Sequence, residues 1–280
     1  MLIGFNINSQ ESIENICKND ANYFQIFTSE PTKFIYNNKF SLSKETKKYI
    51  KNNNIGIVIH GSFCINLARS KNDKIALNSI YLLKNDINIC NNIGALGVII
   101  HMGKDTEKLG ETKSIENYIN NLNTILKETQ NGIIILETGA NCGSEVGSKL
   151  NILGMIREKC ICKERVKFCI DTCHIYSSGY DIANEDFVDI LEEYIEKTLG
   201  WNNVIVAHIN DSKEILNSKK DRHADITDGD ISKRNLNSFM KFINNFAKRN
   251  IPMILETPSD RISYEDQINL IKFFMNNFKT

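Results

Sequence analysis

The sequence lacks several features that would place it in other classes of protein. Its 280 residues carry 34 basic and 34 acidic side chains, so there is no overall positive charge of the kind that holds nucleic acid non-specifically. No stretch has the length of a membrane span. No G-x-G-x-x-G or phosphate-loop pattern is present, which argues against a nucleotide cofactor. Because the acidic and basic side chains balance, any positive electrostatic field must be local. Bound metal ions would add positive charge that the count of side chains omits.

The cysteines and the first residues bear on the cellular compartment. The eight cysteines show no paired C-x-x-C framework, and the segment MLIGFNINSQ lacks the basic start and the apolar stretch of a signal peptide. We therefore expect reduced thiols in an intracellular, cytoplasmic protein. Association with a nucleoid or a viral factory is compatible with this expectation.

Eight short apolar runs recur along the chain, with stretches of helical periodicity between them. Near-continuous apolar character is typical of parallel strands that are buried on both faces. Eight alternating units predict an α/β fold, a single (β/α)8 TIM barrel over residues 1–280, more than an open sheet. The runs are Leu2–Asn6, Tyr23–Phe27, Gly56–His60, Gly97–His101, Gly132–Glu137, Val166–Asp171, Val204–His208 and Pro252–Glu256; the helical stretches include Ile75–Asn91, Ile115–Thr129, Asn184–Thr198 and Leu236–Arg249.

Histidines and carboxylates follow these runs at the point where each strand ends. Such barrels keep their chemistry at the C-terminal mouth, so side chains at strand ends should meet there. All five histidines of the chain fall at or just after strand ends, which favours a metal cluster over scattered buried histidines around one metal or none. The predicted ligands are His60, His101, Glu137, Asp171, His174, His208, Asp221, His223 and Glu256.

Nine ligands exceed what one ion needs. A four-coordinate zinc takes about four, which leaves enough for two or three ions with a shared carboxylate. Imidazole and carboxylate ligands without cysteine fit zinc, with manganese or iron as alternatives; we interpret Cys169 and Cys173 as structural. Paired ions can clamp a phosphodiester and supply hydroxide at neutral pH.

Several segments together resemble one known family. These are HGSFCINLA at residues 60–68, FCIDTCH at residues 168–174, HINDSKEILNSKKDRH at 208–223, and the ligand-bearing IIHMG, ILETGANCGSEVG and PMILETP. In this order and nearly end to end, they are similar to the endonuclease IV family of zinc-dependent apurinic/apyrimidinic endonucleases.

The resemblance implies a site and a reaction. Three zinc ions are expected. His60, His101 and Glu137 would hold the first ion, and Glu137 would also bind the second. It further implies a monomer that acts on double-stranded DNA with abasic sites. A metal-held hydroxide would cut the phosphodiester 5′ of the lesion, leaving a 3′-hydroxyl and a 5′-deoxyribose phosphate, with 3′-end cleaning as a further activity. Besides Glu137, the second ion would be bound by Asp171, His208 and Glu256. The third ion would be bound by His174, Asp221 and His223. Glu137 and Glu256 would also be the catalytic residues.

The DNA-contacting positions depart from the family pattern. Phe63 stands where tyrosine is usual, Cys64 replaces a larger apolar wedge, and Lys33 lies where an inserted arginine is expected. Asn217 replaces a glycine, and asparagine tolerates the left-handed conformation that this turn requires. Arg222 is the best candidate for a phosphate contact, and Lys213, Lys219 and Lys220 are weaker ones. Asn6, Asn8 and Asn66 are candidates for the lining of the groove.

Two other functions remain open from the sequence. A sugar isomerase or epimerase on the same barrel would also place Glu, Asp and His at strand ends, but usually around one or two ions. A non-catalytic, metal-stabilised DNA-binding protein would close the ligands around each ion, with no open position. The segment Asp221–His223 with His174 favours the nuclease, because it supplies ligands for a third ion.

Overall fold

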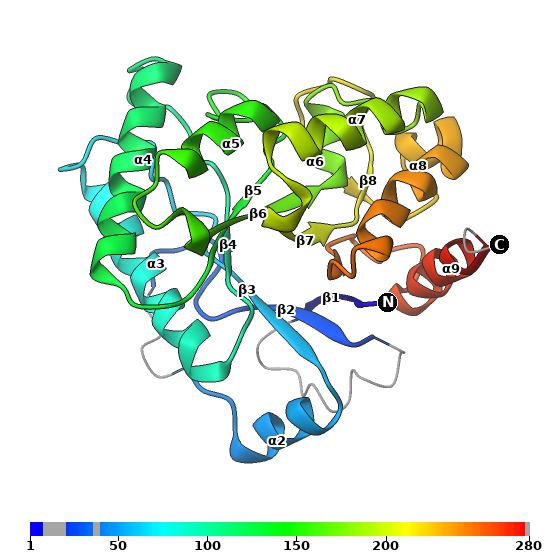
Figure 1. Ribbon diagram of the computed structural model, residues 1–280, viewed down its shortest axis with the longest axis horizontal. Coiled ribbons are helices and arrows are strands. Elements are labelled where there is room, and N and C mark those ends of the chain that lie inside the picture. Colours follow the sequence, from blue (N-terminus) through cyan, green and yellow to red (C-terminus); the bar gives the residue numbers. More distant parts are fainter. Residues whose placement is uncertain (8–20, 36–39, 278–280) are drawn as a thin grey trace.

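The computed structural model describes residues 1–7, 21–35 and 40–277 of the chain. Eight parallel strands close into a barrel in the order β1-β10-β7-β6-β5-β4-β3-β2 (Figure 1). The sequence prediction of a TIM barrel is therefore confirmed. The barrel strands are β1 (Ile3–Ile7), β2 (Tyr23–Phe27), β3 (Gly56–His60), β4 (Val98–Ile100), β5 (Ile134–Glu137), β6 (Val166–Asp171), β7 (Val204–His208) and β10 (Met253–Leu255).

Helices surround the barrel and connect successive strands (Figure 1). Several begin at a side-chain cap: Asp73 accepts from the amides of Ile75 and Ala76, and Asn184 accepts from those of Asp186 and Phe187. They are α2 (Lys44–Asn52), α3 (Lys74–Ile93), α4 (Glu111–Glu128), α5 (Leu150–Glu158), α6 (Thr172–Ser177), α7 (Glu185–Thr198), α8 (Asp230–Lys248) and α9 (Tyr264–Asn277), with 3-10 turns at Lys163–Arg165 and Trp201–Asn203.

Some predicted boundaries were wrong. The fourth and eighth strands end one residue earlier than predicted, so His101 and Glu256 directly follow β4 and β10. The last predicted helix begins six residues before Leu236, because α8 continues across a kink at Asn235 (φ −163°, ψ 93°). A short antiparallel hairpin of β8 (Asp211–Ser212) and β9 (His223–Ala224) was not predicted, since two-residue strands leave no periodic signal.

The barrel interior contains an apolar layer that is distinct from the core between strands and helices. Side chains two residues apart on a strand point to the same face, and seven strands each contribute one buried residue to this layer. Partly buried Leu2, Leu96, Ile133 and Ile205 pack against it. The layer therefore fills the barrel like a core and leaves no pore; its members are Tyr23, Val58, Ile99, Ile135, Cys169, Val206 and Ile254.

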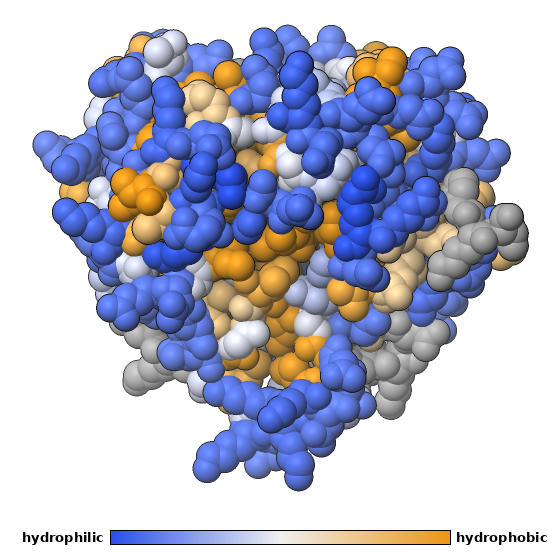
Figure 2. All heavy atoms as spheres, viewed as in Figure 1, coloured by the Kyte–Doolittle hydropathy of each residue, from blue (hydrophilic) through white to orange (hydrophobic). Residues whose placement is uncertain are grey.

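The outer surface is mostly hydrophilic. On the face shown in Figure 2, apolar side chains gather near the centre, over β2 and β3, and charged or polar groups surround them. No helix in the described part of the chain has the length and apolar character needed to cross a membrane. The seven cysteines among the described residues are free, in agreement with the expected reduced thiols, whereas Cys17 lies outside the described residues.

Candidate metal centre

A polar layer lies directly above the apolar layer, at the C-terminal ends of the same strands. Each residue of the apolar layer is followed two positions later by a polar side chain on the same face. Most of these polar side chains are almost entirely buried; His208, for example, is 0% exposed and Glu137 is 1% exposed. The polar layer consists of Gln25, His60, His101, Glu137, Asp171, His208 and Glu256.

Glu137 lies at the centre of the predicted ligands. Its Oε2 is 3.4 Å from His60 Nε2 and 3.5 Å from His101 Nε2. Its Oε1 is 2.8 Å from His208 Nδ1 and 3.5 Å from His174 Nδ1. One carboxylate thus faces imidazoles from both sides, as a group shared between two cations would.

The remaining predicted ligands come from α6 and from the segment around the hairpin. Asp221 is 3.1 Å from both His174 Nε2 and His223 Nε2. Asp171 Oδ2 lies 3.6 Å from His223 Nε2, so it joins this group as well. The local fold holds Asp171 and His174 together, because Asp171 caps α6 by accepting a hydrogen bond from the amide of His174. All nine predicted ligands therefore meet at one mouth of the barrel.

The donor atoms form three overlapping groups that could each hold an ion. One contains His60, His101 and Glu137, and a second contains Glu137, Asp171, His208 and Glu256. The third contains Asp171, His174 and His223, with Asp221 beside both imidazoles. Cys173 can join Asp221 and His223. Burial raises the pKa of its thiol to about 12, in keeping with the structural role that we expected.

Unused polar atoms support the fit of metal ions to these groups. Glu137 Oε2, His174 Nε2 and His223 Nε2 are buried and make no hydrogen bond among the described residues. Leaving such groups unsatisfied costs free energy, and metal coordination would satisfy them. The donor set of imidazole nitrogens and carboxylate oxygens fits zinc and also fits manganese or iron.

The outer partners of the histidines determine which ring nitrogen faces the cluster. Backbone carbonyls can only accept, and the Nδ1 atoms of three histidines each lie beside one: His60 at 2.7 Å from Gly61 O, His174 at 2.8 Å from Thr138 O, and His223 at 3.2 Å from Glu256 O. These rings therefore donate outward from Nδ1 and present an unprotonated Nε2 to the cluster in their neutral form. His208 is reversed: its Nδ1 faces the carboxylates, and its Nε2 faces Gln25.

Charges in the cluster shift the pKa values in opposite directions. Burial alone would raise the pKa of Glu137, but His101, His208 and His60 hold it well below its usual value. Burial lowers the pKa of His101 to about 4. For His223, burial also favours the neutral ring, but Asp171 and Asp221 outweigh it and raise the pKa to about 9. The metal-free cluster is thus a set of buried, strongly interacting ionisable groups.

Three supporting residues were missed in the sequence. Gln25, in the middle of β2, contacts both His208 and Glu256. Asn210 donates to Asp171 Oδ2 at 2.8 Å, and Thr138 Oγ1 accepts from the amide of Asp171 at 2.9 Å. An amide within the otherwise apolar run YFQIF was the available signal, since Gln25 stands at the same face as the strand-end ligands.

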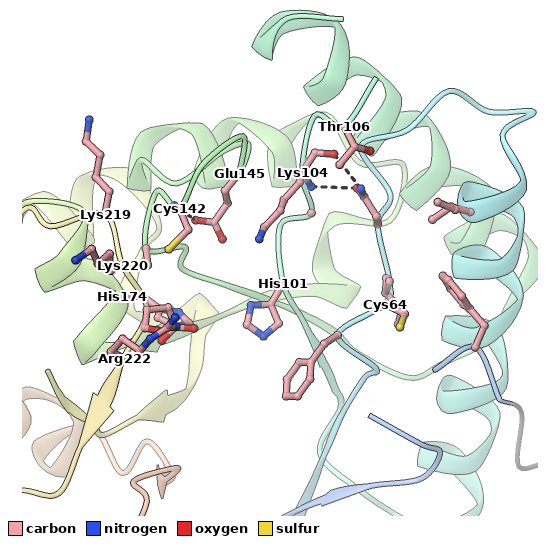
Figure 3. Close-up of a pocket in the computed structure, with 18 residues that line it drawn as sticks. Cys64, His101, Lys104, Thr106, Cys142, Glu145, His174, Lys219, Lys220 and Arg222 are labelled. Atoms are coloured by element: carbon pink, nitrogen blue, oxygen red, sulfur yellow. Dashed lines mark hydrogen bonds and ion pairs between the residues drawn. The ribbon is translucent and has the colours of Figure 1, made fainter. Parts of the chain in front are cut away.

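A cavity of about 800 Å³ opens beside the cluster (Figure 3). Its lining includes His101 and His174, together with Phe63, Cys64, Asn66 and Arg222. Figure 3 shows Lys104, which the sequence analysis did not single out, extending into this space above His101. The cavity thus connects the predicted ligands with Phe63, Cys64 and Arg222, and with the weaker candidates Asn66, Lys219 and Lys220.

Phe63 lies next to the cluster but remains open to solvent. Its side chain is 54% exposed, although its ring centroid is only 5.3 Å from that of His60 and 5.6 Å from that of His101. Its amide donates to Pro31 O at 2.8 Å, which ties the loop after β3 to the loop that carries Lys33. Lys33 itself is exposed and does not line the cavity.

The weaker DNA-contacting candidates differ in their surroundings. Arg222 is exposed at the cavity, and it donates to Asp221 O. Asn66 lines the cavity, as expected, and its amide holds the backbone of Lys104. Asn217 has φ 59°, which confirms the predicted left-handed turn. Lys213, Lys219 and Lys220 are exposed, Lys220 pairs with Glu214, Asn6 is near Gln25, and Asn8 lies outside the described residues.

Comparison with known proteins gives a family and several relatives. The model of the family described as xylose isomerase-like TIM barrel matches residues 13–274. A protein of Acanthamoeba polyphaga mimivirus, named as an endonuclease 4, is 38% identical over 96% of this chain and 89% of its own length.

Solved structures share the architecture. Endonuclease IV from Thermus thermophilus superposes with a TM-score of 0.81 at 22% identity, covering 99% of this chain and 100% of its own. A D-tagatose 3-epimerase-like protein gives a TM-score of 0.71 at 16% identity over 100% of both chains. These structural likenesses show the fold, which a nuclease and an epimerase-like protein have in common.

Proposed function

The chain belongs to the endonuclease IV family of xylose isomerase-like TIM barrels, and on that premise we propose that it is a zinc-dependent endonuclease that cuts double-stranded DNA at abasic sites. The observation that carries the proposal is the convergence of nine histidine and carboxylate side chains on one mouth of the barrel: eight form three groups that share Glu137 and Asp171, and Asp221 lies beside the two imidazoles of the third group. An isomerase has no need of the third group.

The residues that would hold the metals follow from these groups. His60 and His101 would share one ion with Glu137; Asp171, His208 and Glu256 would hold a second with it; and His174, Asp221 and His223 would hold the third. When bound, zinc ions neutralise phosphate charge and lower the pKa of bound water toward neutrality.

The protein would also orient the reacting groups. Glu137 is fully enclosed, whereas the Glu256 side chain is 16% exposed at the mouth. We assign both carboxylates to the catalytic machinery, where they accept hydrogen bonds from the attacking water and hold it in line with the phosphodiester. Cleavage on the 5′ side of the abasic nucleotide would leave a 3′-hydroxyl and a 5′-deoxyribose phosphate, and the same site would remove groups that block 3′ ends.

The exposed side chains beside the cluster would recognise the DNA. Phe63 would stack in the gap left by the lost base, with Cys64 next to it as a smaller wedge. Arg222 would contact a phosphate at the cavity, and Lys33 would contact the DNA from the adjoining loop after β2, outside the cavity. Following the family resemblance, we expect the protein to act as a monomer inside the cell.

One experiment tests the function directly. The purified protein is incubated with a labelled duplex that contains a single abasic analogue, with zinc, with a chelator, and with zinc restored after chelation. We expect incision 5′ of the analogue, lost with chelator and regained with zinc, and a product that a DNA polymerase extends from its 3′-hydroxyl. The same duplex without the analogue should remain intact.

Other results would overturn the proposal. Binding of the abasic duplex without incision in any metal condition would indicate the non-catalytic DNA-binding protein. Interconversion of ketoses with about one bound ion per chain, and no incision, would indicate the isomerase.

A further inference from the structure

One buried amide connects two predicted ligands of the metal centre. Gln25 lies in the middle of β2, its side chain is 0% exposed, and it occupies the β2 position of the polar layer. Its neighbours in that layer are imidazoles and carboxylates, which suit transition metals better than an amide does. A fully buried polar group at this position calls for an explanation.

The surroundings of Gln25 fix the orientation of its amide. Nε2 lies 2.5 Å from Glu256 Oε1 and 3.4 Å from Asn6 Oδ1. An ionised carboxylate can only accept hydrogen bonds, so the amide nitrogen must face Glu256. The amide oxygen then faces His208 Nε2, at 2.8 Å.

This orientation dictates the tautomer of His208. An amide oxygen has no proton to donate, so His208 Nε2 must carry the hydrogen of this bond. The lone pair of the neutral ring is therefore on Nδ1, which lies 2.8 Å from Glu137 Oε1 and 3.1 Å from Glu256 Oε2. The other histidines with an outer partner donate to backbone carbonyls, whereas His208 depends on a side chain.

The same amide restrains Glu256. Because Oε1 accepts from Gln25, Oε2 is left facing His208 Nδ1 and the cluster. The backbone amide of Glu256 is held separately, by Asn210 Oδ1 at 2.9 Å. Gln25 thus acts on one ligand from each of two adjacent strands, β7 and β10.

We propose that Gln25 is a positioning residue of the metal centre: it selects the His208 tautomer that offers Nδ1 to the ion shared with Glu256, and it turns that carboxylate toward the same ion. The inference rests on the proposed zinc-dependent function. It does not make Gln25 a ligand or a catalytic residue, since its amide hydrogen-bonds to Glu256, Asn6 and His208. Loss of a residue that hydrogen-bonds to metal ligands typically lowers metal affinity or activity by about 10–100-fold.

Two variants separate the two contacts. Gln25→Met has a similar shape and removes both hydrogen bonds. Gln25→Glu keeps an oxygen toward His208 but replaces the donor toward Glu256. Zinc binding is followed by titrating the metal-free proteins in competition with a chromogenic chelator. For Gln25→Met we expect one zinc equivalent to bind about 10–100-fold more weakly, with the other equivalents unchanged.

A spectroscopic measurement on the zinc-loaded protein reads the tautomer itself. Proteins labelled with ¹⁵N-histidine give separate ring signals, and the His208 signal is identified by its loss in His208→Asn. We expect protonated Nε2 in the native protein and in Gln25→Glu, and a loss of that fixed form in Gln25→Met. The tautomer is read in the native protein, and His208→Asn serves only to assign the signal, so a folding defect in a Gln25 variant cannot leave the proposal without a test.

Gln267 provides a matched control. It is also a fully buried glutamine, but its amide contacts the backbone of Ile226 and Ile262 and the side chain of Asp225, away from the predicted ligands. Gln267→Met should lower the unfolding midpoint while leaving zinc affinities and the His208 signal as in the native protein.

In steady-state assays, Gln25→Met should lower kcat about 10–100-fold with little change in KM, because the buried amide cannot reach DNA.

The outcomes distinguish this inference from the proposed function. A native protein that binds zinc and cuts abasic DNA, but whose zinc affinities and kcat are unchanged in a folded Gln25→Met variant, would overturn the role of Gln25 alone. A native spectrum with the proton on Nδ1 would overturn it as well. Failure of the native protein to bind zinc would instead remove the proposed function.

Discussion

Two layers of side chains lie one above the other inside the barrel, built by the same strands two residues apart. The lower layer, from Tyr23 to Ile254, is apolar and closes the interior. The upper layer, from Gln25 to Glu256, is equally enclosed for the most part but carries buried ionisable groups, among them Glu137, whose Oε2 has no hydrogen-bond partner among the described residues. A two-residue step along a strand thus separates a packed core from a reactive site.

The difference shows how this barrel divides stability and function. Apolar side chains gain free energy from burial, at roughly 25 cal/mol per Å² of apolar surface. Buried carboxylates and imidazoles gain little unless they are paired, hydrogen-bonded or bound to metal. We therefore expect substitutions in the lower layer to change unfolding, and substitutions in the upper layer to change metal binding and catalysis.

The largest effect is expected at the centre of the upper layer. Glu137→Ala removes the carboxylate that faces four imidazoles, and we expect kcat for abasic DNA to fall by about 1,000-fold or more, beyond the 10–100-fold of a supporting residue. Single-turnover cleavage measures the loss, and fluorescence anisotropy should show a much smaller change in DNA affinity. Near-normal turnover would contradict the sharing of Glu137 between ions. Glu128→Ala, at a surface ion pair, is the control.

A matching change in the lower layer should act on stability instead. Ile254 is fully buried two residues before Glu256, and Ile254→Ala should lower the free energy of unfolding by about 2–5 kcal/mol. Urea denaturation measures this, with Ile190→Ala at a 60% exposed position expected to change it by no more than about 0.5 kcal/mol. If Ile254→Ala lost zinc equivalents without losing stability, the two layers would not be separable.

The pH dependence of zinc binding tests the charges at the edge of the upper layer, where His223 lies 3.6 Å from Asp171. The pKa of His223 in the metal-free protein is raised to about 9, so its ring holds a proton at neutral pH that must leave before Nε2 binds zinc. Zinc affinity for this group should therefore rise at least about tenfold per pH unit between pH 6.5 and 9, and more steeply where His174, whose pKa is raised against the effect of burial by Asp171 and Asp221, also loses a proton. Chelator competition at several pH values measures the slope.

The raised pKa of His223 also determines the direction in which the stability of the metal-free fold changes with pH. A pKa raised above the unfolded value stabilises the fold fully below about pH 6.5, and this contribution is lost as the pH rises toward 9. His223→Ala should lose one zinc equivalent together with its pH dependence. An unchanged zinc content, or a flat affinity in the native protein, would argue against this ligand assignment.

The smallest expected effect lies at the rim, outside both layers. Phe63→Ala should weaken binding of abasic DNA by roughly 1–3 kcal/mol, the contribution of one stacked aromatic, while zinc content stays constant. Dissociation constants at fixed salt measure this. Phe63→Tyr should bind normally, and Phe273→Ala, which removes a 62% exposed aromatic from α9, should have no effect. An unaltered dissociation constant for Phe63→Ala would exclude stacking.

The sequence predicted the barrel because its signals are local. Apolar runs mark the strands, and their ends mark the mouth, so His60, Glu137 and His208 could be placed at one end of the fold without coordinates. The predicted β4 and β10 were each one residue too long at both ends, since the sequence pattern runs over Gly97–His101 and Pro252–Glu256 whereas the strands cover only Val98–Ile100 and Met253–Leu255. The β8–β9 hairpin was missed for want of a periodic signal.

The sequence by itself thus determined the strands, their order along the chain and the kinds of ligand that each strand end carries, because these depend on the two-residue alternation of a strand. Only the tertiary structure decided which ligands share a carboxylate, that Gln25 and Asn210 support them, and that the loops bearing Lys33 and Phe63 are tied together. Those contacts join residues up to 231 positions apart, as between Gln25 and Glu256. Their distances are fixed by the closure of the barrel and the register of its strands, which no local pattern encodes.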